Sequence, residues 1–255
     1  QFGGQTGIAL AHGLEAAGYR LLGASAAVID QMEDRDRFYA FLDEIDVAPL
    51  PGEEVGTPAA LYEAVDRIGF PCVVRPSYVI GGKGMHILQS EADLARISPD
   101  LAYPLLIDLY VAGRELEVDC VTDGQTVYVP AILEQIEAAG VHSGDSTMVM
   151  PPVETSEAHQ RQIDTITKRI GQALTYRGAL NIQFVLKDDT IYVLEINPRA
   201  SRTVPIVSKV TGEPLIEWAT RAALGHSLEG VLPVERKQLT GYAVKTPIFS
   251  SLKLP

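Results

Sequence analysis

The residues most suited to chemistry lie in the stretch LEINPRASRTVP, over residues 194–205. Glu195 and Asn197 end a run of β-forming residues two positions apart, so their side chains should point to the same side of a strand. Carboxylate and amide oxygens are hard ligands that suit Mg²⁺ or Mn²⁺, and the guanidinium groups of Arg199 and Arg202 suit oxyanions such as phosphate. The alternative is an ordinary strand end followed by a salt-bridged turn.

A predicted β-hairpin brings a second amide to this stretch. A turn of three residues after Lys187 places Gln183 directly opposite Glu195 on the neighbouring strand. The same register places Asn181 opposite Asn197. A turn of two residues would put Gln183 and Glu195 on opposite faces of the sheet. Because a metal site needs both side chains together, we predict the three-residue turn.

The second informative stretch is IGGKG, over residues 80–84, between two strand-like runs. Three glycines and a lysine expose backbone N–H groups and one cation, which suits a lid over phosphates as well as an ordinary glycine hairpin. Met85 follows in place of the Lys-Ser/Thr of a P-loop, so this is not a Walker A motif. Arg75 lies in the preceding apolar strand and needs a partner, either an acidic side chain or a ligand anion.

Two further acids, Glu117 and Asp119, alternate with apolar residues in a predicted strand and so share one face of a sheet. A carboxylate beside a nucleotide commonly accepts hydrogen bonds from ribose hydroxyls, although acids that face solvent are the more common case. The loop over residues 137–146 contains His142 and Ser143, which suggest a nucleophile pair. Since the sequence offers no clear third member, we favour substrate positioning for this loop.

The composition restricts the class of protein. At 255 residues and 46% hydrophobic, the chain can bury a sizeable core. Its formal charge of −12 argues against a general attraction to nucleic acid or anionic lipid. Cys72 and Cys120 each lie in an apolar β-like run, which suits reduced core thiols. Neither a membrane span nor a signal peptide is evident, so we expect a cytoplasmic protein that binds no membrane.

Helices and strands in mixed order must position these residues. Residues 1–29 have the features of a small α/β domain that lacks its front, and one helix is expected over residues 30–46 with Asp30 as its N-terminal cap. Arg35 lies early in that helix, where pairing with neighbouring acids on a solvated face is the simplest interpretation. Amphipathic helices alternate with strands along the rest of the chain.

Several motifs occur in an order that is typical of one family. They are FGGQT, EDRDRF, VVRPSYVIGGKGM, EVD, AGVHSGDS, NIQF and EINPRASRTVPIVSKVTG. This order resembles the ATP-grasp half-modules of the large subunit of carbamoyl phosphate synthetase, nearly from end to end. The family has two homologous halves, one that makes carboxyphosphate from bicarbonate and one that phosphorylates carbamate. The motifs SRTVP and GGKGM resemble those of the second half, which implies that carbamate is the acid phosphorylated.

The resemblance implies an α/β (α+β) protein with the ATP-grasp fold, in which two α+β subdomains with mainly antiparallel sheets clasp ATP. The implied segments are a remnant of an α/β domain (1–29), a connecting helix (30–46), subdomain A with a glycine-rich lid (47–110), subdomain B with the metal site (111–240) and a C-terminal tail (241–255).

The resemblance also implies roles for residues at matching positions. The implied catalytic residues are Arg75, Arg199 and Arg202, and the implied metal ligands are Gln183, Glu195 and Asn197. The implied nucleotide contacts are Arg35, Arg75, Gly81, Gly82, Lys83, Gly84, Met85, Asp108, Leu109, Tyr110, Val111, Glu117, Gly140, Val141, His142, Ser143, Gln183 and Glu195. Glu115 is the alternative to Glu117, because the region after Leu109 is offset relative to the family.

The implied reaction is the phosphorylation of carbamate, or of bicarbonate, by Mg-ATP, and its product carbamoyl phosphate serves pyrimidine and arginine biosynthesis. The implied cofactors are ATP, a pair of Mg²⁺ or Mn²⁺ ions and K⁺, and the implied partners are the rest of the large subunit and a glutaminase small subunit. Metals and arginines would balance the charge on the transferred phosphoryl group. Two alternatives remain, namely another carboxylate–amine ligase with the ATP-grasp fold and a nucleotide-binding fragment without complete turnover.

Overall fold

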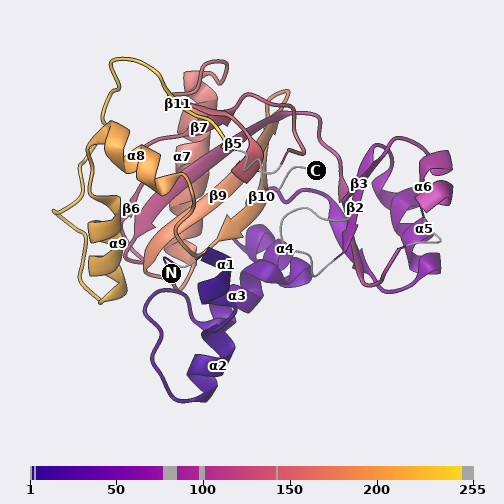
Figure 1. The fold of residues 1–255 in the computed structure, drawn as a ribbon, viewed down its shortest axis with the longest axis horizontal. Helices are drawn as coiled ribbons and strands as arrows, with labels where there is room; N and C mark the ends of the chain where they lie inside the picture. Colours follow the sequence, from indigo (N-terminus) through magenta and orange to yellow (C-terminus); the bar gives the residue numbers. More distant parts are fainter. Residues whose placement is uncertain (1, 3, 77–84, 98–100, 142, 249–255) are drawn as a thin grey trace.

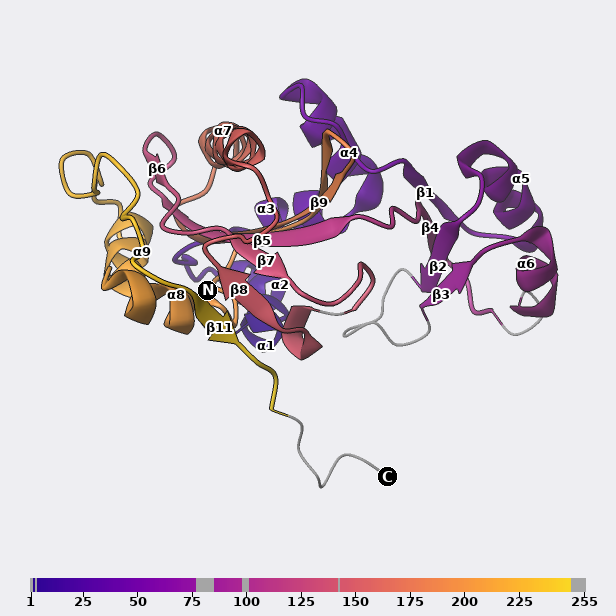
Figure 2. The same ribbon diagram turned by 90° about the horizontal axis from the view of Figure 1, so that it is seen from above.

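The chain forms one small and one large antiparallel sheet, and helix α4 (Arg35–Glu44) lies between them (Figures 1 and 2). The computed structural model describes residue 2 and residues 4–76, 85–97, 101–141 and 143–248. The predicted glycine lid over residues 80–84 and the predicted site residue His142 lie outside the described residues. Within the described ranges, no helix has the length and hydropathy needed to cross a bilayer.

The small sheet has the strand order β1-β4-β2-β3. Its strands are β1 (Gly52–Val55), β2 (Cys72–Pro76), β3 (His86–Leu88) and β4 (Leu105–Leu109). Helices α5 (Pro58–Ile68) and α6 (Glu91–Ile97) contribute Leu61 and Leu94 to a core that the strands complete with residues such as Ile107. The strands β2 and β4 are antiparallel, so the end of β4 lies beside the start of β2. Asp108, near the end of β4, contacts Arg35 of α4.

The large sheet has the strand order β10-β9-β5-β7-β8-β11, and β6 pairs with β5. Its strands are β5 (Arg114–Thr122), β6 (Val127–Tyr128), β7 (Leu133–Gln135), β8 (Met148–Met150), β9 (Gly178–Lys187), β10 (Thr190–Asn197) and β11 (Ala243–Lys245). The expected C-terminal tail therefore includes a strand, because β11 pairs with β8 at the edge of the sheet.

The two faces of the large sheet are covered by different helices. One face packs against α3 (Ala26–Glu33), α4 and α7 (Glu157–Ala173) through residues such as Val118 and Ile182. The other face packs against α8 (Val204–Thr211) and α9 (Leu215–Ala223), and Figure 2 shows α7 and α8 on opposite sides of β5. Alternation along β5 and β9 explains both cores, since neighbouring residues of a strand point to opposite faces.

The N-terminal helices differ from the expectation of one helix over residues 30–46. Short helices α1 (Gly4–Ile8) and α2 (Ala11–Ala16) come first, and then α3 and α4 meet at Asp34. Ser25 caps α3 and Asp34 caps α4, because each side chain accepts a backbone N–H of the first turn. Asp30 is therefore inside α3 and does not begin a helix.

The turn between β9 and β10 also differs from the prediction. Lys187 pairs with Thr190 across a turn of two residues, where three were predicted. A β-bulge between Val193 and Glu195 takes up one extra residue, so Glu195 still pairs with Gln183. The predicted facing pair is thus confirmed, while the predicted turn length is wrong.

Both predicted core cysteines are free and buried. Burial raises the pKa of the Cys72 thiol to about 11 and also raises the pKa of Cys120. Both thiols are therefore protonated at neutral pH, which agrees with the expectation of reduced core cysteines.

Candidate functional site

Polar residues form two rows across β5, β9 and β10, on the face of the large sheet that also carries α8 and α9. Cross-strand pairing sets both rows, because partners in an antiparallel ladder share a face. The rows are Glu117, Gln183 and Glu195, and then Asp119, Asn181 and Asn197. Asn197 donates from Nδ2 to Oδ1 of Asn181 at 3.3 Å, which confirms that the second predicted pair faces as expected.

The predicted metal ligands lie at the edge of these rows. Glu195 is exposed, Gln183 is half-buried, and Asn197 is 8% exposed. One carboxylate and two amide oxygens suit a hard divalent cation that keeps water and substrate oxygens as its other ligands. In the described part of the chain, no three histidine, cysteine or acidic side chains converge as a metal cluster. The predicted metal site therefore depends on one carboxylate and two amide side chains, those of Glu195, Gln183 and Asn197.

The segment after Asn197 carries the two predicted arginines. Arg199 donates from Nη2 to Oδ1 of Asn197 at 3.0 Å and is half-buried, whereas Arg202 is exposed. Oδ1 of Asn197 therefore joins a guanidinium group to the row of amides. The arrangement can present positive charge next to a bound metal and so can balance a phosphoryl group between them.

Glu117 and Asp119 are buried, at 3% and 2% exposure, so the alternative of acids that face solvent is wrong. Asn181 Nδ2 donates to Oε1 of Glu117 at 2.8 Å and to Oδ1 of Asp119 at 3.1 Å. Burial, and then the charge of Glu117, raise the pKa of Asp119 to about 7. Asp119 and Oε1 of Glu117 therefore bind protein hydroxyl and amide groups, whereas Oε2 of Glu117 is buried and has no hydrogen-bond partner among the described residues. The contact between Glu117 and a nucleotide stays a prediction.

Glu115, the alternative to Glu117, lies on the same face at the open end of β5. It is half-buried, and its Oε1 accepts the backbone N–H of Gly140 at 2.7 Å. Burial raises the pKa of Glu115 above its usual range. The contact brings two predicted nucleotide residues together, since Gly140 belongs to the predicted pocket loop; Val141 beside it is exposed, and a 3₁₀ turn follows over Ser143–Asp145.

A second group of predicted residues lies between the two sheets. Asp108 at the end of β4 accepts hydrogen bonds from Arg35 Nη2, from Tyr39 Oη at 3.0 Å and from Arg75 Nη2 at 3.3 Å. The partner that Arg75 required is thus an acid. The expectation that Arg35 pairs with neighbouring acids on a solvated face is wrong, because its side chain is 9% exposed and reaches Asp108.

Arg35 also connects this group with the first one. Its Nη1 donates to the backbone carbonyl of Leu194, the bulge residue, at 3.3 Å. Its guanidinium carbon lies 4.7 Å from the ring centroid of Tyr39, which adds a cation–π contact. A bulge leaves part of the hydrogen-bond ladder between strands unpaired. The Leu194 carbonyl can therefore accept a hydrogen bond from Arg35.

The predicted segment Leu109–Val111 connects the two sheets. Tyr110 Oη donates to the carbonyl of Ala139 at 2.9 Å, which joins the connection to the loop before Gly140. Leu109 and Val111 pack with apolar residues of β9 and β10. Met85, at the other end of the predicted lid, is half-buried and directly precedes β3.

Lys245 lies beside the predicted pocket loop, and nothing in the sequence singled it out. From β11 its Nζ donates to the carbonyls of Ser146 at 2.8 Å and of Gly144 at 3.5 Å. Burial lowers the pKa of Lys245, and the charge of Glu117 opposes this change. A lone lysine in a three-residue strand gives no sequence signal, because only the pairing of β11 with β8 brings it to this loop.

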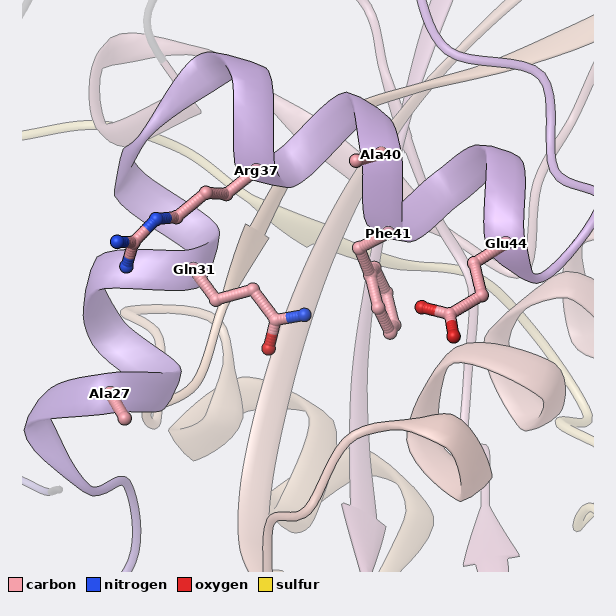
Figure 3. A pocket seen from close by; sticks show the side chains of 6 residues that line it. All are labelled: Ala27, Gln31, Arg37, Ala40, Phe41 and Glu44. Carbon is pink, nitrogen blue, oxygen red and sulfur yellow. The ribbon is translucent and has the colours of Figure 1, made fainter.

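A surface pocket of about 340 Å³ lies apart from both groups, between α3 and α4 (Figure 3). Its lining residues are Ala27, Gln31, Arg37, Ala40, Phe41 and Glu44. Phe41 belongs to the core on the face of the sheet opposite the polar rows. The pocket is therefore no part of the candidate site. Arg37 lines it, whereas Arg35 on the same helix reaches Asp108.

Two antiparallel sheets, with polar rows on the large sheet and a second polar group between the sheets, form the architecture of the ATP-grasp fold, and solved structures agree. The chain is similar to biotin carboxylase from Campylobacter jejuni in a β,γ-ATP complex, with a TM-score of 0.77 and 18% identity over 93% of this chain and 55% of that chain. It is also similar to purK, an N5-carboxyaminoimidazole ribonucleotide synthetase with ADP, with a TM-score of 0.74 and 17% identity over 93% of this chain and 61% of that chain.

Sequence comparison shows the family. Residues 34–231 match the family described as carbamoyl-phosphate synthase L chain, ATP binding domain, and the chain belongs to this family. It is 49% identical over 260 residues to the carbamoyl phosphate synthase arginine-specific large chain of Geobacillus stearothermophilus, covering 100% of this chain and 25% of that protein. It is 46% identical to the protein of the same name from Bacillus subtilis, over 98% of this chain and 25% of that one. The chain thus spans about a quarter of the length of these curated relatives.

Proposed function

We propose that this chain is an ATP-grasp module of a carbamoyl phosphate synthetase large subunit, which phosphorylates carbamate with Mg-ATP to give carbamoyl phosphate. The observation that carries the proposal is the pairing of Gln183 with Glu195, with Asn197 and its bound Arg199 next to them. Family membership supports it. The motifs SRTVP and GGKGM favour carbamate over bicarbonate as the acid that is phosphorylated, because they resemble the motifs of the second half of the family.

The proposed roles follow from charge. Gln183, Glu195 and Asn197 would hold the divalent ions, Mg²⁺ or Mn²⁺, which when bound neutralise charge on the phosphates. Arg199 and Arg202 would bind the small acid and the transferred phosphoryl group, and both would act by position and charge. Carbamate is already anionic, so no residue has to remove a proton from it.

The proposed nucleotide site lies where the two sheets meet. Arg75 and the glycine segment 80–84 would contact the phosphates, and residues 109–111 would contact adenine and ribose. Glu115 replaces Glu117 as the proposed partner of the ribose, because Glu115 is half-buried at the open end of β5, whereas Glu117 is 3% exposed and its Oε1 binds Asn181 and Thr203. The loop over residues 140–143 would line the pocket. K⁺ is a further proposed cofactor.

We extend the proposal to the whole protein in coarser terms. The five segments 1–29, 30–46, 47–110, 111–240 and 241–255 remain the proposed division of the chain. The proposed partners are the rest of a large subunit and a glutaminase small subunit, and the proposed compartment is the cytoplasm. The relatives carry the name arginine-specific, which favours arginine biosynthesis over pyrimidine biosynthesis as the proposed pathway.

The test is the reverse reaction, in which ADP and carbamoyl phosphate give ATP. In the intact protein we expect ATP synthesis that Glu195→Gln reduces by about 100-fold or more, because the site loses its only carboxylate ligand. Glu157→Gln is the matched control, since Glu157 is an exposed acid on α7. Equal rates for wild type and Glu195→Gln would reject the metal assignment.

The same assay separates the alternatives. Mg-ATP binding without ATP synthesis would favour a nucleotide-binding fragment without turnover. Phosphorylation of another carboxylic acid, detected as ATPase activity that depends on that acid and not on bicarbonate or carbamate, would favour another ligase of this fold.

A further inference from the structure

The segment that carries Arg199 and Arg202 is tied to the buried acids of β5. Ser201 Oγ lies 2.8 Å from Oδ2 of Asp119, and Thr203 Oγ1 lies 2.8 Å from Oε1 of Glu117. Thr203 Oγ1 also contacts Oδ2 of Asp119, at 2.5 Å. Two hydroxyl groups on either side of Arg202 are therefore bound by one pair of carboxylates.

The other end of the segment reaches the same acids. Asn181 donates both hydrogens of its side-chain amide to the pair, one to Glu117 and one to Asp119. Its Oδ1 accepts from Asn197, whose own Oδ1 accepts from Arg199. The segment from Asn197 to Thr203 is thus fixed at both ends to Glu117 and Asp119.

The hydroxyl of Thr203 does not cap the helix that follows it. Thr203 is the residue before the first turn of α8, and a threonine there commonly accepts a backbone N–H of that turn through its side chain. The structure has no such side-chain bond at Thr203. Its side chain is 1% exposed and turned towards the two acids instead, so contact with them has replaced stabilisation of the helix start.

We infer that Glu117 and Asp119 are positioning residues, which hold Ser201 and Thr203 and thereby aim Arg199 and Arg202 at the small acid and the transferred phosphoryl group. The inference rests on the proposed function and deepens it. It gives the two acids of the EVD motif a task in the reaction that requires no contact with the nucleotide.

Thr203→Val tests the inference because valine keeps the shape of threonine and removes the hydroxyl. We expect the KM for carbamoyl phosphate in ATP synthesis to rise by about tenfold or more, which corresponds to about 1.4 kcal/mol. The KM for ADP should stay within about twofold, since Asn197, the proposed metal ligand in this segment, is held by Asn181 and not by Thr203. Thr203→Ser restores a hydroxyl at the same place and should return the KM for carbamoyl phosphate towards that of wild type.

Asp119→Asn provides a second variant in case Thr203→Val does not fold. The side chain of asparagine can accept a hydrogen bond from Asn181 and donate hydrogen bonds to Ser201 and Thr203. It therefore keeps these contacts without the negative charge. We expect this variant to keep both KM values near those of wild type, whereas Asp119→Leu should raise the KM for carbamoyl phosphate. Equal KM values in Thr203→Val and wild type, or an Asp119→Asn that behaves like Asp119→Leu, would overturn the inference.

Crystal structures of Thr203→Val and Thr203→Ser separate this inference from the proposed function. We expect the backbone of residues 199–202 to move in the valine variant and to keep its place in the serine variant. If wild type made no ATP, the proposed function would fail. The two structures would still show whether the Thr203 hydroxyl holds residues 199–202 in place. An unmoved segment in Thr203→Val would contradict the inference.

Discussion

Arg35 on α4 donates to the carboxylate of Asp108 at the end of β4, and both side chains are shielded from solvent. This contact crosses from the helices on the large sheet to the small sheet. Because Arg35 also binds the carbonyl of Leu194 in the bulge of β10, one guanidinium group links the predicted phosphate-binding Arg75, through Asp108, with the strand that carries Glu195.

Arg35→Met should destabilise the protein. Removal of one partner of a buried ion pair costs about 3–5 kcal/mol, and we expect about 3 kcal/mol because Tyr39 and Arg75 still contact Asp108. Denaturant unfolding monitored by circular dichroism measures the difference. Arg37→Met on the same helix is the control and should change the free energy of unfolding by less than about 0.5 kcal/mol, since Arg37 is exposed.

Gly52→Ala should also destabilise the protein, for a steric reason. A Cβ at Gly52 would lie 2.6 Å from Tyr39 Oη and 2.7 Å from the carbonyl of Ile107, and it would collide with Oδ1 of Asp108. Overpacking of this kind costs about 1–3 kcal/mol. Gly56→Ala is the matched control, because a Cβ there meets nothing within 4 Å. Equal melting temperatures for the two variants would show that the junction of the sheets is looser than the structure indicates.

Lys245→Met should loosen the loop that precedes β8. The ammonium group binds the carbonyls of Gly144 and Ser146, and a hydrogen bond to a charged group contributes about 1.5–3 kcal/mol. We expect amide hydrogen exchange over residues 144–147 to accelerate by about tenfold or more. Lys187→Met, at an exposed strand end, should leave exchange in this loop unchanged.

The free energy of unfolding should depend on pH through the titration of Asp119. Four oxygen–oxygen contacts of 2.5–2.8 Å join Glu117, Asp119, Ser201 and Thr203, but the two hydroxyls supply only one proton each. A proton on the acid pair relieves this shortage, in agreement with the pKa of Asp119 near 7. The folded state then holds a proton that the unfolded state has already released.

The sign follows from this difference in bound protons. Between the usual value of 3.8 and about 7, the contribution of Asp119 to stability is lost as the pH rises. We expect Asp119→Asn to flatten the fall in the free energy of unfolding between about pH 5 and about pH 8. Asp188→Asn, on the exposed turn between β9 and β10, is the control, and a slope for Asp119→Asn that equals its slope would contradict the assignment.

Local pattern in the sequence was sufficient for much of the fold and for one part of the site. Motif order indicated the ATP-grasp fold, and the two-residue period brought Gln183 to the same face as Glu195. The turn length was wrong because apolar residues of β10 keep their alternation only up to Val193, after which Ile196 is the next buried one. That break in the alternation is the signal of the bulge.

The sequence by itself determined the family, the facing amides and acid, and the arginines that follow them, because all of these depend on residue type and on short spacings along the chain. Only the tertiary structure decided the partner of Arg35, the burial of Glu117 and Asp119, and the approach of Lys245 to the loop before β8. Each of these joins residues far apart in sequence, such as Arg35 with Asp108 and with Leu194. Their meeting depends on how the sheets and helices pack, which no local pattern records.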